Sequence, residues 1–174
     1  MSSQGGAPAI GTAPTLSWSA PAVGSATLKG TTFDVQNSLT ATGAVAVTNT
    51  GLFTKGATGA IAADGGFSTS GAVNLANNIT TSNTTLSIGG ALQIAEGKTV
   101  TLSTQAAAGA GDITLSGTTT GTTGTAAEVL VLNAGTGTLN AAAIYGSGTA
   151  ADTTGLTTVT VTDAGVTNFN NPIA

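Results

Sequence analysis

The sequence predicts an all-β protein, more specifically a parallel β-solenoid with about 20 residues in each coil. Three observations support this prediction. Large apolar residues occur in short pairs two positions apart, which is the alternation typical of a half-buried strand. Glycine, asparagine and aspartate separate these pairs, and tight turns favour those residues. The pairs also recur at intervals of about 20 residues, as expected when each coil of a solenoid repeats the previous one.

The composition favours short ordered strands over disorder or helix. Of the 174 residues, 106 are Thr, Ala, Gly or Ser, yet the hydrophobic fraction is 40% and Pro occurs only 4 times. Disordered chains usually carry more charge or proline, whereas threonine favours strands and small residues suit narrow corners. The best helical pattern, residues 139–145, lies between Gly137 and Gly146, and this favours a strand or a corner over a helical turn.

Residues 1–24 differ from the rest of the chain, since they contain three of the four prolines. Proline fixes φ and lacks a donor, so this segment is predicted to be an extended Pro/Gly-rich arm or an edge cap. Its only tryptophan, Trp18, is expected to cover the open end of the core or to contact a neighbouring subunit. Pro14 and Pro21 are candidate assembly contacts in the same segment.

Residues 25–174 are predicted to form the β-solenoid domain. Each apolar pair is expected to mark one short strand, with both large side chains on the core side. In chain order the pairs are Phe33/Val35, Val45/Val47, Val73/Leu75, Leu86/Ile88, Leu92/Ile94, Val100/Leu102, Ile113/Leu115, Leu130/Leu132 and Val159/Val161.

The intervals between pairs give the predicted coil. Successive members of the series Val73, Leu92, Ile113 and Leu130 are about 20 residues apart, and so are Leu139 and Val159. Coils stacked at about 4.8 Å would give some seven or eight levels and a rod of about 35 Å. An antiparallel β-sandwich serving as a filament subunit is the alternative, but its strands are usually longer and its core richer in aromatic residues.

Three segments combine alternating Thr and apolar residues with Gly-Thr or Asp/Asn-Ala-Gly turns, and the first of them contains Gly-Asp-Ile-Thr followed by Gly-Thr. They are residues 109–118 (Gly-Ala-Gly-Asp-Ile-Thr-Leu-Ser-Gly-Thr), 131–139 and 156–165. The pattern resembles the repeats of filamentous-haemagglutinin-type and autotransporter-passenger bacterial surface proteins, best over residues 70–170. This resemblance implies a right-handed parallel β-helix with a role in adhesion or scaffold-building.

The residue types that are missing exclude much chemistry. The chain has no His and no Cys, and its three basic residues are Lys29, Lys55 and Lys98. Triad catalysis, the usual zinc sites and polysaccharide cleavage all rely on residue types scarce here, so we expect no enzyme activity and no cofactor. A net charge of −4 argues against a nucleic-acid partner. The longest run of large apolar residues, 129–132, is too short for membrane insertion, and this chain shows no signal peptide.

Two groups of polar residues are candidate sites with simpler explanations. Threonine pairs could order water on a flat face and bind ice, although threonine also serves as the ordinary outward residue of a strand; the pairs are Thr99/Thr101, Thr118/Thr120, Thr123/Thr125, Thr136/Thr138 and Thr158/Thr160/Thr162. Acidic residues stand in turns, at Asp64, Asp112, Asp152 and Asp163. They follow no calcium-loop pattern and fit turn formation better.

The strongest functional expectation is self-assembly. A solenoid has open ends that must be capped, and this chain offers few charged residues for that purpose. The sequence therefore predicts an extracellular or cell-surface structural protein that polymerises with itself into a filament, sheath or surface layer. Candidate contacts near the end of the chain are Phe169 and Ile173. The alternatives are a rigid stalk fragment of a large bacterial adhesin, with an unidentified cell-surface or carbohydrate ligand, and an ice-binding solenoid.

Overall fold

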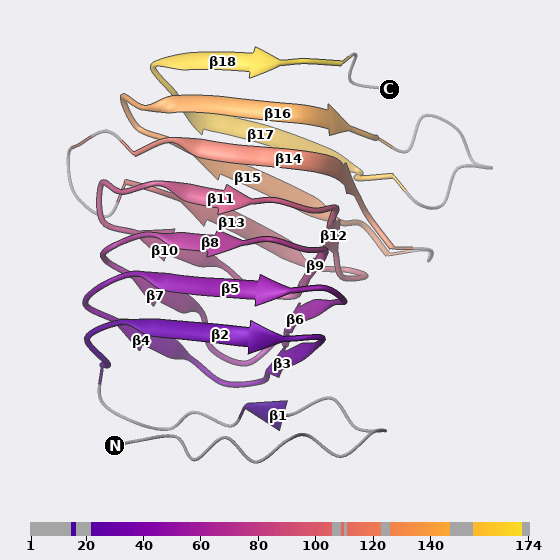
Figure 1. The fold of residues 1–174 in the computed structure, drawn as a ribbon. Coiled ribbons are helices and arrows are strands. Elements are labelled where there is room, and N and C mark those ends of the chain that lie inside the picture. Colours follow the sequence, from indigo (N-terminus) through magenta and orange to yellow (C-terminus); the bar gives the residue numbers. More distant parts are fainter. Residues whose placement is uncertain are drawn as a thin grey trace.

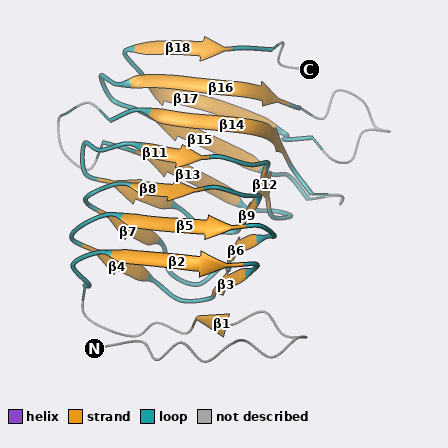
Figure 2. Cartoon of the chain, viewed as in Figure 1, coloured by secondary structure: helices purple, strands orange, loops and turns teal. Residues whose placement is uncertain are grey.

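The predicted parallel β-solenoid is confirmed. The computed structural model describes residues 15–16, 22–105, 109, 111–122, 126–146 and 155–171. Within these ranges the chain forms strands and turns but no helix (Figure 2). Every pairing between the named strands is parallel, which excludes the antiparallel sandwich. Residues 139–145, considered for a helical turn, mostly belong to a strand instead.

The strands stack in three faces that wind around one core (Figure 1). The first face contains β2 (Ala26–Gly30), β5 (Val45–Asn49), β8 (Phe67–Thr69), β11 (Leu86–Ile88), β14 (Ile113–Thr120), β16 (Thr138–Ile144) and β18 (Val166–Phe169). The second face contains β1 (Thr15–Leu16), β3 (Phe33–Val35), β6 (Phe53–Lys55), β9 (Val73–Leu75) and β12 (Leu92–Ile94). The third face contains β4 (Leu39–Ala41), β7 (Ile61–Ala63), β10 (Ile79–Thr81), β13 (Thr99–Ser103), β15 (Val129–Asn133) and β17 (Thr158–Asp163).

Two long strands continue from the first face onto the second. The end of β14 pairs with β12, since Leu92 lies opposite Thr119, and the end of β16 pairs with the end of β14. At the other end of the stack, β1 pairs with β3, and Val23 forms an isolated bridge with Ala41. Parts of the arm predicted at residues 1–24 therefore pair with the solenoid.

The coil length agrees with the predicted value of about 20 residues only in the first part of the stack. There the first-face pairs are Ala26 with Val45, Val45 with Phe67, and Phe67 with Leu86, and all three steps are close to that length. In the later part the pairs are Leu86 with Ile113, Ile113 with Leu139, and Leu139 with Thr167. Each of these later steps is longer than any of the first three, so the coils become larger along the chain.

Three of the predicted alignments are therefore wrong. Leu130 stacks on Val100, on the third face, whereas Ile113 is on the first. Ile113 stacks on Leu86 and not on Leu92. Val159 stacks on Leu130, on the third face, whereas Leu139 is on the first. The physical reason is that only paired strands must keep register; a longer connection at a corner adds residues without disturbing the ladder. Equal spacing along the sequence is thus not sufficient evidence that two residues stack.

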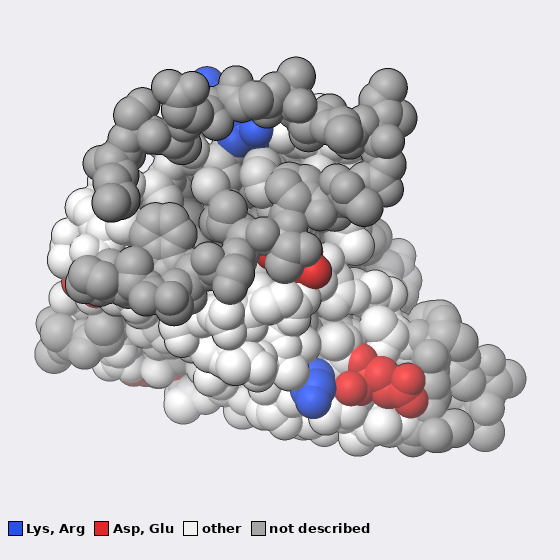
Figure 3. Space-filling view, turned by 90° about the horizontal axis from the view of Figure 1, so that it is seen from below, with Lys and Arg blue, Asp and Glu red and all other residues white. Residues whose placement is uncertain are grey.

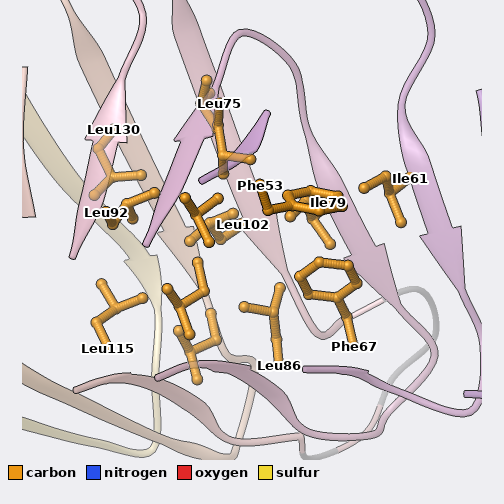
Figure 4. Close-up of a cluster of buried hydrophobic side chains, with 14 of the residues drawn as sticks. Phe53, Ile61, Phe67, Leu75, Ile79, Leu86, Leu92, Leu102, Leu115 and Leu130 are labelled. Atoms are coloured by element: carbon orange, nitrogen blue, oxygen red, sulfur yellow. The ribbon is translucent and has the colours of Figure 1, made fainter. Parts of the chain in front are cut away.

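The core consists of columns of inward side chains, one from each level. On the first face one column runs through Val45, Phe67, Leu86, Ile113 and Leu139, which are all buried. Figure 4 shows how side chains from all three faces meet in the centre of the coil. The rings of Phe53 and Phe67 meet edge to face, with centroids 6.0 Å apart. Since these contacts cross between faces, burial of apolar surface holds the three sheets together.

Glycines at the corners allow the coils to approach closely. A Cβ atom on Gly90 would lie 2.4 Å from the carbonyl carbon of Gly71 in the level below. A Cβ on Gly117 would lie 2.5 Å from the carbonyl carbon of Gly90. The corner between the first and second faces therefore stacks backbone on backbone, which explains why this position is glycine in successive coils.

Replacing a side chain in the core column should destabilise the fold strongly. For Phe67→Ala we expect the free energy of unfolding to fall by about 3–5 kcal/mol, through lost apolar burial and the cavity that remains. The matched control is Ser68→Ala, because Ser68 is the exposed neighbour on the same strand and should change stability by less than about 0.5 kcal/mol. Guanidinium unfolding at low protein concentration measures both, and equal losses would contradict the assigned facing of β8.

A methyl group at a stacked corner should also destabilise the fold. For Gly90→Ala we expect a loss of about 1–3 kcal/mol, because the added Cβ overlaps backbone that is fixed by the ladder. Gly24 has no atom within 4 Å of a built Cβ, so Gly24→Ala is the control and should be close to neutral. The same unfolding measurement compares the two, and a neutral Gly90→Ala would show that the corners can separate.

Candidate functional site

The C-terminal end of the stack leaves two strand edges without a partner among the described residues. β18 pairs only with β16, and β17 pairs only with β15. All four residues of β18 are exposed, as are five of the six residues of β17. A free parallel edge presents unpaired backbone N–H and C=O groups, so this end is able to accept a further strand on each of these faces.

Apolar side chains at this end are exposed although they face the core direction. Phe169 pairs with Ala141, which is buried, so Phe169 continues an inward column and yet is 37% exposed. Val161 pairs with buried Leu132 and is likewise 37% exposed. Val166 on the same coil pairs with Thr138, so it faces outward, and it is 53% exposed. Of the predicted assembly contacts, Phe169 is therefore found at the open end of the solenoid.

Other predicted site residues fall outside the described part of the chain. They are Trp18, Pro14, Pro21 and Ile173, together with Asp152, Thr123 and Thr125.

The N-terminal end has a free edge on the first face. β2 pairs only with β5 among the described residues, and its alternate residues Ala26 and Leu28 are half-buried against the core. Lys29 is exposed on the same strand. Figure 3 views the molecule from this end; where it shows described residues, most of them are uncharged, and one positive and one negative patch lie side by side.

Lys55 is a buried cation in an otherwise apolar column. It lies between Val35 and Leu75 in register and is 0% exposed. Its Nζ donates to the carbonyl oxygens of Val35 (3.3 Å), Gly56 (2.9 Å) and Thr58 (2.9 Å). The amine thus satisfies the carbonyls of the corner between β6 and β7. Desolvation by burial lowers the pKa of Lys55 from its ordinary value of 10.5, while the negative charge of Asp34 opposes this shift.

Asn49 performs a similar structural task at the corner after β5. Its Nδ2 donates to the carbonyl oxygens of Gly51 (2.7 Å) and Ala72 (3.0 Å), and its Oδ1 accepts a bond from the Gly71 N–H (2.9 Å). One buried side chain therefore links two successive levels. Neither Asn49 nor Lys55 was predicted to have a structural role inside the coil, although the alternation Phe53-Thr54-Lys55 places Lys55 on the core side.

Two of the acidic turn residues accept hydrogen bonds from the next level of the stack. Ser82 Oγ donates to Asp64 Oδ1 (2.7 Å), and the Thr138 N–H donates to Asp112 Oδ1 (2.8 Å). Across the described ranges, no group of three or more His, Cys, Asp or Glu residues is arranged to hold a metal ion. Asp64 and Asp112 therefore link turns of successive levels.

The described threonine pairs do not form one continuous row. On the third face, Val131 lies between Thr101 and Thr160 in register. Thr120 ends β14 at its second-face end, whereas Thr138 begins β16 on the first face. The ice-binding hypothesis requires a flat lattice of threonines, and these described positions do not form one.

Comparison of the chain with protein-family models, with curated proteins and with solved structures found no match. In the described part of the chain, no helix has the length and apolar character needed to cross a membrane.

The buried Lys55 should make stability depend on pH. Because its pKa is lowered in the folded state, the unfolded chain holds this proton more tightly. The free energy of unfolding should therefore rise as the pH increases from the lowered pKa towards 10.5. The measurement is guanidinium unfolding of the natural protein and of Lys55→Met across this range. The stability difference between the two should shift in favour of the natural protein as the pH rises, and a constant difference would contradict the assignment.

Proposed function

We propose that this protein is a structural subunit that stacks on copies of itself to build a filament, sheath or surface layer. The observation that carries the proposal is the open last coil, where Phe169 and Val161 continue core columns but remain partly exposed. Natural solenoids need a cap at such an end, because exposed core and free strand edges favour association. A second copy would bury these side chains and pair these edges.

The chemistry of the chain supports a durable material outside the cell or at its surface. The chain contains no Cys or His, and its charged fraction is only 6%. It therefore has no thiol to oxidise and little charge to repel neighbouring copies. Cohesion would come from backbone ladders and apolar columns, and outward Ser and Thr side chains would keep the surface wetted.

A stalk segment of a large bacterial adhesin is the second candidate. The same open coil favours it, because further coils of one longer chain would cover Phe169 as well as a second copy would. In that case the solenoid provides rigid length, and a cell-surface or carbohydrate ligand binds elsewhere.

Imaging and hydrodynamics of the purified chain test the leading proposal. Negative-stain micrographs should show regular fibres or sheets, and sedimentation velocity should show assembly that grows with protein concentration. The micrographs should also show a fibre width matching one solenoid or a regular multiple of it. Dispersed monomers at high concentration, with a β-type circular dichroism spectrum that proves folding, would overturn the proposal.

A further inference from the structure

We infer that the copies stack head to tail, with β18 of one copy pairing in parallel with β2 of the next; this inference rests on the proposed self-assembly. In the inferred register, Thr167 lies opposite Ala26 of the second copy, and Phe169 lies opposite Leu28 of the second copy. The occupant of the open C-terminal end is thus the N-terminal end of an identical chain.

The two ends have complementary steps. At the C-terminal end, the first face carries β18 one level above the last strands of the second and third faces, β16 and β17. At the N-terminal end, the second and third faces carry β1 and Val23 one level below β2. A second copy therefore places β1 over the end of β16 and Val23 over β17. Its β2 then meets β18, so no face is left with a gap.

The inward columns also continue across this contact. Within the chain, Leu28 and Phe169 belong to the same inward column, which runs from Leu28 through Val47, Thr69, Ile88, Leu115 and Ala141 to Phe169. Leu28 is half-buried and Phe169 is 37% exposed, and each lacks a neighbour on its open side among the described residues. Stacking one on the other removes apolar surface from water on both copies, which favours the contact.

Charge favours the same orientation. In the first two coils and the turn that follows them, the positive and negative charges balance, since this part carries Lys29, Asp34, Lys55 and Asp64. The described residues from 111 to 171 carry only acidic charges, which are Asp112, Glu128 and Asp163. Head-to-tail contact brings the acidic end towards a balanced end, whereas contact between two C-terminal ends would set acidic groups against each other.

Engineered cysteines test this register, because the chain has no cysteine of its own. The double variant Thr27→Cys/Asn168→Cys places two exposed residues on neighbouring strands of different copies. Their Cα atoms would lie about 4.8 Å apart, which is within the range of a disulfide. Oxidation should convert this variant into a ladder of covalent dimers, trimers and larger species on a non-reducing gel. Each single variant should remain almost entirely monomeric on the same gel, because identical positions in a head-to-tail stack lie one whole solenoid apart.

The matched control is Ala46→Cys/Asn168→Cys. Ala46 pairs with Thr27 one level further from the contact, so its Cα would be about 9.6 Å from that of residue 168, too far for a disulfide. Fibres without a ladder in the Thr27 variant, or an equal ladder in the control, would overturn the inferred register and leave the proposed function standing. Efficient dimers from Asn168→Cys alone would show head-to-head contact instead. Absence of both fibres and ladder, in folded protein, would overturn both proposals.

Discussion

The constraint on which this structure depends is the stacking of coils at the spacing of adjacent strands, about 4.8 Å. Each coil must place its backbone almost in contact with the next, at the corners as well as along the strands. A Cβ on Gly90 would lie 2.4 Å from the Gly71 backbone, so glycine is required there. Where the corners leave polar groups inside, Lys55 and Asn49 bond to the backbone of the corner. The fold is thus set by repeated close approach more than by any one contact.

The same constraint explains why the ends of the molecule matter. A level inside the stack has a neighbour on both sides, and its inward residues, such as Leu86 and Ile113, are buried. A level at the end has only one neighbour, so an inward residue such as Phe169 is partly exposed for a purely geometric reason. Nothing in the local sequence of β18 distinguishes it from an internal strand. Because β18 resembles an internal strand but has a free edge, it is suited to pair with a strand of a further level. This is how the fold supports the proposed assembly.

Much of the fold could be predicted from the sequence. Val73 and Leu75, or Leu86 and Ile88, show the alternation of a half-buried strand, and the structure places both members of each pair in the core. The alignment of later coils could not be predicted, because connections of different length precede Ile113 and Leu130. The strands that pair with them are determined by side-chain packing and backbone hydrogen bonds between levels. The number of residues between two positions in the sequence does not reveal these contacts. Phe169 is the candidate assembly contact that lies among the described residues. Its exposure could not be predicted from the local sequence, because it results from the position of β18 at the end of the stack.

The sequence by itself determined the class of protein: many short strands, tight glycine corners and a surface with little charge and no thiol. These are local properties, set by side-chain size and backbone preference over a few residues. Only the tertiary structure decided which strands lie on each other, that Lys55 lies inside the core, and that the two ends have complementary steps. Those features depend on contacts between residues in different coils, which are far apart in the sequence. A longer or shorter corner changes which residues meet, although the alternation of residues within each strand stays the same.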